Sequence, residues 1–312
     1  MRKTTHKTSL KAINGKFLLG SLLLLSLLLF KDLTGQSISW TSYIGGSRSV
    51  NDVAVHNKLA WIATKNGLMK LNWQTGDKHL YHPGNADIPV DYIVSVKVDN
   101  QGNKWLSTYK GLIKYNGNKW QVFNKSNSGL NRNYISVIEA DGQKVWFGAY
   151  GGVYEYNGSQ IKAHTAYFPL TTVTDLAVDK NGNVWAGTTT DGVGKFDGNQ
   201  WTFYSENNSP VGSRTTNVAA DDQGRVWFMD ELNSAIHLKD GQNWQKFTSN
   251  NSGLPKEDLM NIALDKDGHL WINQSGVLTQ YTGSQWKIYK SPAANVTVDD
   301  TEDIFIDDKG NP

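Results

Sequence analysis

The stretch DKNGNVWAGT at residues 179–188 decides the fold, because close variants of it recur along the chain. Each variant places a tryptophan at the position of Trp185. These tryptophans, spaced 39 to 44 residues apart, are Trp61, Trp105, Trp146, Trp185, Trp227 and Trp271. A period near forty whose units read as short strands is typical of stacked four-stranded sheets, since one such sheet cannot bury both of its faces alone. The sequence therefore predicts a tandem repeat of β-sheets.

Each repeat reads as four short strands, which we call a to d in chain order. An alternating apolar run such as residues 94–98 precedes a D-x-x-G turn, in which Asp caps the turn and Gly takes the left-handed conformation. Strand b carries the repeated Trp, and a second tight turn such as Asn116-Gly117 joins strands c and d. Strand d carries two aromatic residues three positions apart, as in Trp120 and Phe123. We expect these large side chains to form the core between adjacent sheets.

The pattern D-x-x-G-x-x-W, followed by Thr and Gly and then by a short apolar strand ending in Tyr, resembles the two-component regulator propeller repeat. The resemblance extends over residues 38–312. It implies a β-propeller of the kind that forms the sensory region of bacterial membrane receptors, often hybrid histidine kinases of Bacteroidetes, which detect extracellular ligands. Similar propellers also occur as free-standing secreted proteins.

The repeats predict an all-β fold, a β-propeller of four-stranded antiparallel blades with six complete blades and a partial seventh. Residues 40–43 match a strand d that no strands a to c precede, so we assign them to the seventh blade. Residues 304–306 and the turn from Asp307 to Gly310 match strand a of that same blade. We therefore expect one propeller domain over residues 36–312 that is incomplete at its C-terminus.

Residues 1–35 read as a signal peptide, because basic residues precede an unbroken apolar run from Phe17 to Phe30. This run has 14 residues, whereas a bilayer crossing needs roughly 20. Cleavage near Gly35 predicts a secreted or periplasmic protein. Contact with a membrane would then need an uncleaved N-terminal segment, which the short run disfavours, or a region beyond residue 312.

Composition argues against several classes of function. The predicted signal contains six of the 31 basic and one of the 29 acidic residues, so cleavage leaves 25 basic and 28 acidic residues. No nucleic-acid partner is expected, because such a partner needs a basic surface. The chain has no cysteine, which excludes thiolate catalysis, zinc–thiolate sites and disulfides. Asp265 to Gly268 imitates the start of a calcium loop, but Gly276 stands where a bidentate Glu is required. We therefore expect a turn there.

Three functions remain open, and none comes with a recognisable catalytic residue, metal site or cofactor. The resemblance implies a sensory module for a small molecule or an oligosaccharide. A propeller lyase similar to virginiamycin B lyase is the enzymatic alternative, but it needs a metal-assisted group of His and acidic residues on one face. The candidate histidines fall at dissimilar blade positions: His56, His164, His237 and His269. A secreted scaffold that binds a protein partner is the third function.

The loops that join strand b to c and strand d to the next a are the predicted ligand-binding region, because they converge at the mouth of a propeller's channel. Their side chains vary between repeats while the flanking strands stay alike, and variation within a constant frame can encode specificity. The candidates on b-to-c loops are Lys65, Tyr109, Tyr150, Asp191, Asp230 and Glu231, and those on d-to-a loops are Arg132 and Arg214. We expect the tyrosines to stack on a sugar or peptide and the charged residues to form hydrogen bonds. Without a ligand, the same residues would form a solvated rim.

Overall fold

The computed structural model describes residues 50–142, 144–165, 168 and 171–290. It also describes two short paired backbone strands, β1 (Leu24–Leu25) and β2 (Ile44–Gly45). The predicted cleavage site and both predicted segments of the seventh blade lie outside the described residues. Among the residues that are described, no helix is long and apolar enough to span a membrane.

The described strands beyond β2 form six antiparallel blades of four strands each, and one pairing between Thr188 and Thr215 joins blades 4 and 5 into a continuous eight-stranded sheet. Blade 1 contains β3 (Val50–His56), β4 (Leu59–Thr64), β5 (Gly67–Asn72) and β6 (Lys78–Tyr81), and blade 2 contains β7 (Ile93–Val98), β8 (Lys104–Thr108), β9 (Gly111–Tyr115) and β10 (Trp120–Phe123). Blade 3 contains β11 (Val137–Asp141), β12 (Lys144–Ala149), β13 (Gly152–Tyr156) and β14 (Ile161–His164), and blade 4 contains β15 (Val173–Val178), β16 (Val184–Thr188), β17 (Val193–Phe196) and β18 (Trp201–Tyr204). Blade 5 contains β19 (Thr215–Ala220), β20 (Val226–Asp230), β21 (Ala235–Asp240) and β22 (Asn243–Phe247), and blade 6 contains β23 (Leu259–Leu264), β24 (Leu270–Gln274), β25 (Val277–Tyr281) and β26 (Trp286–Lys290).

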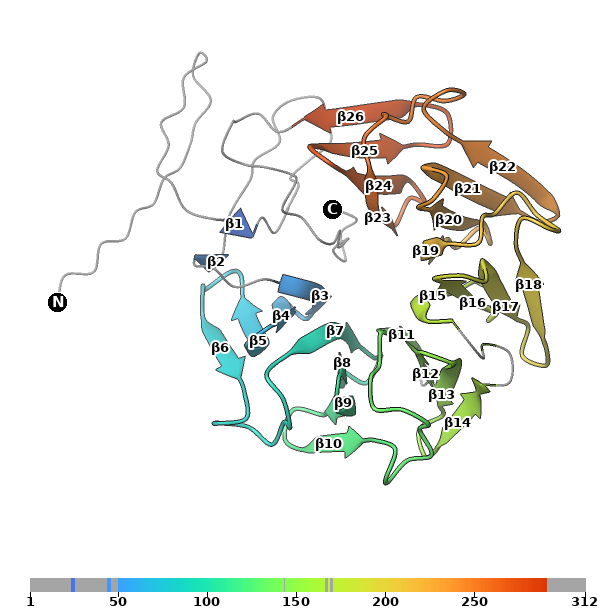
Figure 1. Cartoon of the computed structure of the whole chain (residues 1–312). Helices are drawn as coiled ribbons and strands as arrows, with labels where there is room; N and C mark the ends of the chain where they lie inside the picture. Colours follow the sequence, from blue (N-terminus) through green and yellow to red (C-terminus); the bar gives the residue numbers. More distant parts are fainter. Residues whose placement is uncertain are drawn as a thin grey trace, which may run out of the picture.

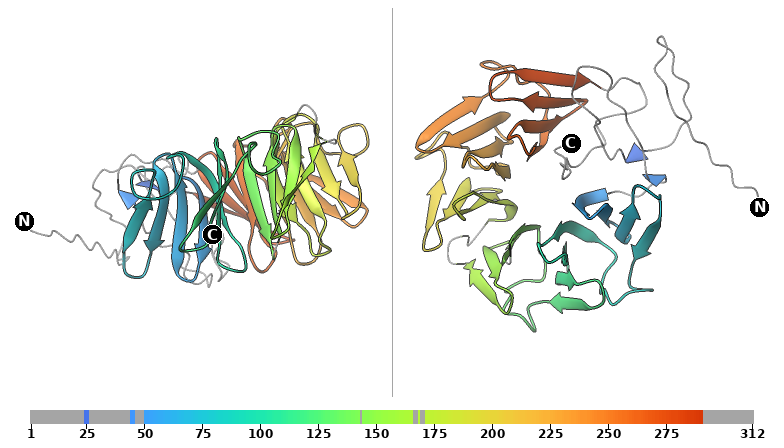
Figure 2. Two further views of the ribbon diagram at one scale, coloured as in Figure 1. Left: turned by 90° about the horizontal axis from the view of Figure 1, so that it is seen from below. Right: turned by 180° about the vertical axis from the view of Figure 1, so that it is seen from behind.

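The blades follow one another around a central axis, with strand a innermost and strand d outermost (Figure 1). The two further views in Figure 2 show the same ring from the side and from behind. Because consecutive strands run antiparallel, the a-to-b and c-to-d turns lie at one end of the propeller. The b-to-c and d-to-a loops lie at the other end, which we call the rim. The predicted all-β propeller is confirmed, and six blades within the described residues are consistent with the predicted number.

The repeated tryptophans fill the space between blades, as predicted. Each of the six strand-b tryptophans is at most 4% exposed. Trp105 stacks on Phe123 of its own strand d, with ring centroids 6.1 Å apart, and lies 4.9 Å from the ring of Tyr156 in the next blade. Burial of such large rings stabilises the blade contacts, because each removes on the order of 150 to 250 Å² of surface from water. The same arrangement recurs along the ring and holds the rim loops on a rigid frame.

Candidate functional site

The a-to-b turns carry a repeated hydrogen-bond network around their first Asp. In blade 2, an Asp99 carboxylate oxygen accepts a hydrogen bond from the indole Nε1 of Trp105 at 2.9 Å. Asn103 donates to the same carboxylate from its backbone at 2.9 Å and from its side chain at 2.8 Å. Gly102 closes the turn in the left-handed conformation, with φ of 77°. The D-x-x-G-x-x-W motif therefore connects the a-to-b turn to the core through the hydrogen bond between Trp and Asp.

Two further blades have the same hydrogen bond from the Trp indole to the Asp carboxylate, with the same donor–acceptor distance. Asp179 accepts from Trp185, and Asp265 accepts from Trp271, in both cases at 2.9 Å. Burial alone would raise the pKa of the Asp179 carboxyl, but hydrogen bonds from Trp185 and Asn183 outweigh it and hold the pKa below its usual value. The pKa of Asp99 is lowered for the same reasons. The carboxylates of Asp99 and Asp179 therefore have a structural role.

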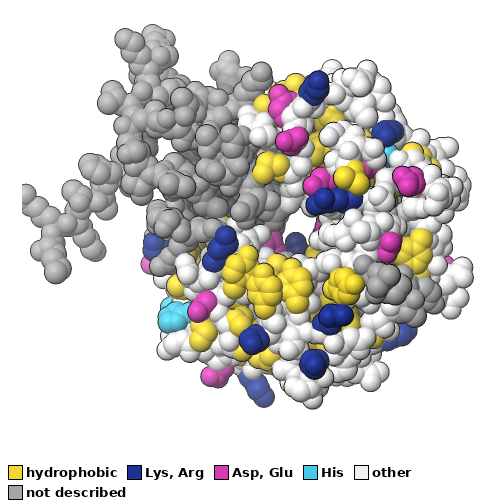
Figure 3. Space-filling view, viewed as in Figure 1, with side chains coloured by type: hydrophobic (Ala, Val, Ile, Leu, Met, Phe, Trp, Pro, Cys, Tyr) yellow, Lys and Arg dark blue, Asp and Glu magenta, His cyan; other side chains and the backbone are white. Residues whose placement is uncertain are grey.

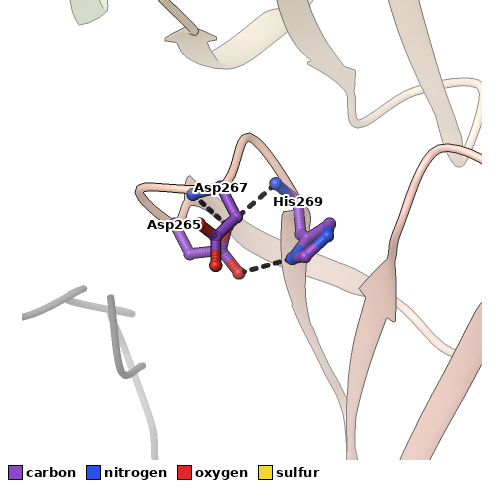
Figure 4. Close-up of side chains that lie close together, drawn as sticks. All are labelled: Asp265, Asp267 and His269. Carbon is purple, nitrogen blue, oxygen red and sulfur yellow. Dashed lines mark hydrogen bonds and ion pairs between the residues drawn. The ribbon is translucent and has the colours of Figure 1, made fainter. Parts of the chain in front are cut away.

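One group of three side chains in the described residues could hold a metal ion, and it belongs to this network. It consists of Asp265, Asp267 and His269, at the a-to-b turn of blade 6 (Figure 4). His269 Nδ1 lies 3.0 Å from an Asp265 carboxylate oxygen, where Asn103 and Asn183 bond to the Asp of their own turns. The other Asp265 oxygen accepts from the backbone N–H groups of residues 267 and 269. The turn predicted at Asp265 to Gly268 is confirmed, and its hydrogen bonds explain why these side chains meet.

The rim begins with b-to-c loops that a buried threonine shapes. Thr108 Oγ1 donates to the carbonyl of Gly111 at 2.8 Å and accepts from the N–H of Lys110 at 3.0 Å. Gly111 has a φ of 132°, and a Cβ there would lie 2.1 Å from the carbonyl oxygen of Phe123. Thr64 and Thr188 make equivalent bonds in blades 1 and 4. Each buried threonine therefore fixes the backbone of its loop and presents the variable side chain that follows it, in a loop that is one residue longer in blade 4 than in blades 1 and 2.

Tyr109, a predicted site residue, belongs to a cluster of three tyrosines from three loops. Its side chain is 51% exposed. The Tyr134 ring stacks on it with centroids 4.9 Å apart and an interplanar angle of 16°, and the Tyr92 ring lies 5.3 Å away at 60°. Burial and the two neighbouring tyrosines raise the pKa of Tyr134. We refer to Tyr92, Tyr109 and Tyr134 as the tyrosine cluster.

Tyr92 and Tyr134 were not predicted as site residues, although the sequence places them at equivalent positions of two repeats. Each tyrosine immediately precedes a fully buried isoleucine: Ile93 is the first residue of β7, and Ile135 lies two residues before β11. The N–H of Ile135 donates to the carbonyl of Thr108 at 3.1 Å, which brings the d-to-a loop beside the b-to-c loop of blade 2. A tyrosine at this shared position in two successive repeats could have indicated a pair of rim aromatics.

Arg132 and Tyr150, two more predicted residues, form a pair, and Arg132 lies on the same d-to-a loop as Tyr134 of the tyrosine cluster. The guanidinium carbon of Arg132 lies 4.8 Å from the centre of the Tyr150 ring, within the range of a cation–π interaction. Tyr150 is 37% exposed, and Arg132 is also exposed. Figure 3 shows hydrophobic side chains gathered beside the central opening, over β7, β8 and β11. The structure thus brings three predicted residues, Tyr109, Arg132 and Tyr150, to one sector of the rim.

The other predicted residues lie on other sectors. Lys65 is exposed in blade 1, and Asp191 is exposed in blade 4. Arg214 and Glu231 pair with each other in blade 5, with 3.1 Å between Arg214 Nε and a Glu231 carboxylate oxygen. The eight candidates therefore do not form one site.

The predicted ligand contact at Asp230 is wrong, because this side chain is not on the rim surface. It is the last residue of β20 and is fully buried. Its carboxylate accepts from the N–H of Gly212 at 3.0 Å and from the side chain of Asn233 at 2.8 Å, and it lies 3.3 Å from His237 Nε2. Burial would raise its pKa, but the bonds from His237 and Asn233 hold the pKa below its usual value. Asp230 takes the place of the buried threonine of other blades and shapes its loop.

A polar channel runs along the axis, and its charged lining was not predicted from the sequence. A cavity of about 520 Å³ is lined by strand a of each described blade, with the charged residues Asp52, Lys97, Glu139 and Asp175 among its walls. Burial raises the pKa of Glu139 to about 7, although the nearby Lys97 opposes the shift. Burial likewise raises the pKa of Asp175 to about 6, against a backbone hydrogen bond from Val218.

Some channel side chains also connect neighbouring blades. An Asp52 carboxylate oxygen accepts from the N–H of Val96 at 2.9 Å, and Asp175 accepts from that of Val218 at 2.8 Å. Each bond joins strand a of one blade to strand a of the next. The channel carboxylates Asp52 and Asp175 are therefore partly structural.

Comparison with known families identifies the repeat. Residues 167–190 match the family described as Two component regulator propeller. The chain carries the two-component regulator propeller repeat. This matched segment contains the turn and the tryptophan of blade 4, Asp179 and Trp185. A search of curated proteins found no match to the sequence.

Solved structures with the same fold include two extracellular domains of hybrid two component systems from B. thetaiotaomicron. One is 18% identical with a TM-score of 0.51, and 78% of this propeller repeat chain aligns with 41% of that chain. The other is 21% identical with a TM-score of 0.63, and 78% of this chain aligns with 34% of that one. The chain thus spans less than half the length of these relatives. At such identities, the likeness shows the propeller fold.

A structure of catalytically inactive virginiamycin B lyase from Staphylococcus aureus with quinupristin also has this fold. It is 11% identical with a TM-score of 0.68, and 89% of this chain aligns with 91% of the lyase. The propeller repeat chain therefore shares its architecture both with extracellular domains of two component systems and with an enzyme, so the shared fold does not distinguish between these functions.

Proposed function

We propose that this chain is a non-enzymatic recognition propeller that works outside the cytoplasm and binds a small molecule or an oligosaccharide at the rim of blades 2 and 3. The tyrosine cluster carries the proposal. Three aromatic rings meet at a solvent-facing position on loops that the core fixes in place, and Tyr109 leaves half of its surface exposed. Exposed aromatic groups on a rigid rim suit the apolar face of a sugar or another ring.

A sensory role outside the cytoplasm draws support from two sources. The first is the predicted signal peptide at residues 1–35. The second is the likeness to extracellular domains of two component systems. Because this chain spans less than half of those relatives, transmission of a signal to a kinase is part of the proposal.

We favour recognition over a lyase activity because of where the acidic and histidine side chains lie. A lyase would need a group of these residues at the rim. Within the described residues, the group of three that could hold a metal, Asp265, Asp267 and His269, lies at the opposite end of the blades. A secreted scaffold for a protein partner is then the main competing function.

The experiment is a binding screen with two matched variants. The purified chain is titrated by calorimetry with a panel of neutral and acidic oligosaccharides and small ring compounds. We expect Tyr109→Ala to weaken binding of any hit roughly tenfold, because it removes the exposed ring of the stack. The control is Leu232→Ala, which removes a 63% exposed apolar side chain from the rim of blade 5. Equal affinities for wild type and Tyr109→Ala would overturn the proposal, as would capture of protein partners alone.

A further inference from the structure

The exposed charges of the rim are divided between its two halves. The d-to-a and b-to-c loops from β4 to β12 expose four cations, Lys65, Lys110, Lys125 and Arg132, and two anions, Asp87 and Asp91. The loops from β16 to β23 expose two cations, Arg214 and Lys256, and five anions, Asp191, Glu206, Glu231, Glu257 and Asp258. The tyrosine cluster therefore lies in the basic half, which favours an anionic ligand.

Arg132 differs from the other rim arginine in how its charge is used. Arg214 is neutralised by Glu231, 3.1 Å away. No ion pair in the described part of the chain involves Arg132. Its guanidinium instead lies over the Tyr150 ring at 4.8 Å. A stacked guanidinium keeps its planar set of N–H donors available, and that set matches a carboxylate in a two-point contact.

The loop that carries Arg132 is fixed on both sides. The Asn133 side-chain oxygen accepts from the N–H of Lys125 at 2.9 Å. The N–H of Asn131 donates to the Tyr154 hydroxyl at 3.4 Å, and that of Ile135 donates to the carbonyl of Thr108 at 3.1 Å. Arg132 therefore lies two residues from Tyr134 on a constrained backbone. Such preorganisation lowers the entropy cost of binding.

We propose that Arg132 binds the carboxylate of a ligand whose ring packs on the tyrosine cluster. The inference rests on the proposed function and adds the chemical class, an acid carried on a six-membered ring. A uronic acid unit of an oligosaccharide has this chemistry, and so does an aromatic carboxylic acid. The exposed cations Lys65 and Lys110 on neighbouring loops add longer-range attraction for the same charge.

Three probes test the ligand class by calorimetry: a galacturonic acid oligomer, its methyl ester and phenylacetate. The ester keeps the sugar rings and removes the charge. We expect at least one free acid to bind, and the ester to bind roughly tenfold more weakly than the free oligomer if the sugar is the source. Binding of phenylacetate alone would assign the site to aromatic acids. Binding of neither acid, or equal binding of the acid oligomer and its ester, would overturn the inference.

Variants test the residue. Arg132→Gln should weaken binding of the acid roughly tenfold, and Arg132→Lys should lose part of the affinity, because it keeps the charge without the planar donors. Arg214→Gln is the matched control and should bind as wild type. Thermal unfolding checks that each variant folds. If Arg132→Gln binds normally while Tyr109→Ala does not, the carboxylate inference falls and the proposed function stands. If both variants bind normally, both fall.

Discussion

The two ends of the propeller use the same repeat in opposite ways. At the turn end, Asp99, Asp179 and Asp265 each accept an indole hydrogen bond at 2.9 Å, and their turns share one geometry. At the rim, buried Thr108 and Thr188 both donate to the carbonyl of the Gly that ends their loop, but the loops differ in length and in the side chains that follow the threonine. Repetition at one end serves the fold, and variation at the other end is available for recognition.

The difference between the two ends also separates acidic residues with a structural role from those that can contact a ligand. The first Asp of an a-to-b turn, as in Asp99, Asp179 and Asp265, is buried and accepts several hydrogen bonds, whereas Asp191 and Glu231 at the rim are exposed. Asp230 lies next to the rim in sequence but behaves as a turn-end carboxylate, with four hydrogen-bonding contacts and no exposure. Burial and bonding, more than position along the repeat, separate structural residues from candidate ligand contacts.

Removal of a turn carboxylate should have the largest effect on stability. Asp99→Ala leaves the Trp105 indole and the Asn103 amide without their buried acceptor. We expect the free energy of unfolding to fall by about 3 kcal/mol, because a buried donor that loses a charged partner is costly. Urea denaturation measures the change. The control at the rim is Asp191→Ala, which should change the value by less than about 0.5 kcal/mol. Similar losses in both variants would contradict the division between the two ends.

The channel carboxylate Glu139 and the turn carboxylate Asp99 should make the free energy of unfolding depend on pH in opposite directions. The pKa of Glu139 is raised from 4.5 to about 7. Protonated Glu139 therefore contributes to the free energy of unfolding below pH 4.5, and this contribution is lost as the pH rises through 7. The lowered pKa of Asp99 acts oppositely, since its stability is lost as pH falls below the ordinary value. Glu139→Gln should therefore stabilise the protein by about 2 kcal/mol near pH 8 and by little near pH 5. Equal effects at the two pH values, measured by denaturation, would contradict this cause.

Tyr109→Ala should separate binding from folding. Tyr109 is half exposed, so we expect the free energy of unfolding to fall by about 0.5 kcal/mol or less. Thermal and urea unfolding measure this change next to Asp99→Ala. A loss as large as that of Asp99→Ala would make the tyrosine cluster part of the structural core and remove the main support for a ligand site.

The smallest effect is expected at the group of three residues in the turn of blade 6. His269→Asn places there the residue that blades 2 and 4 have at the same position, so the bond to Asp265 should persist. We expect a change below about 0.5 kcal/mol in the free energy of unfolding. Added zinc or calcium should leave the melting temperature of the wild type unchanged. A rise in the melting temperature that His269→Asn abolishes would show that this turn binds the metal.

Most of the fold could be predicted from the sequence, because its signals are local. The spacing from Asp179 to Gly182 and Trp185 encodes, within seven residues, a turn and the hydrogen bond that joins it to the core. The recurrence of this spacing defines the blades. The burial of the repeated tryptophans follows from their equivalent positions. Each of these features depends on neighbours in sequence or on a regular period.

The site could be predicted only in part, because it depends on contacts between loops far apart in the chain. Tyr109 and Tyr134 meet because the start of blade 3 bonds to the end of strand b in blade 2. The buried Asp230 side chain accepts a hydrogen bond from the N–H of Gly212, which lies 18 residues earlier. The charges of Lys97 and Glu139 face the channel because strand a is the innermost strand of each blade. None of these contacts follows from a short motif.

Hydrogen–deuterium exchange with the tightest-binding compound of the panel shows which end of the propeller binds a ligand. We expect the ligand to slow exchange at residues 108–112, 131–136 and 149–152, around the tyrosine cluster and the Arg132–Tyr150 pair. Exchange at the turns of residues 99–103, 179–183 and 265–269 should stay unchanged. Protection at the turns, with none at the rim of blades 2 and 3, would contradict the assignment of recognition to the variable end of the propeller.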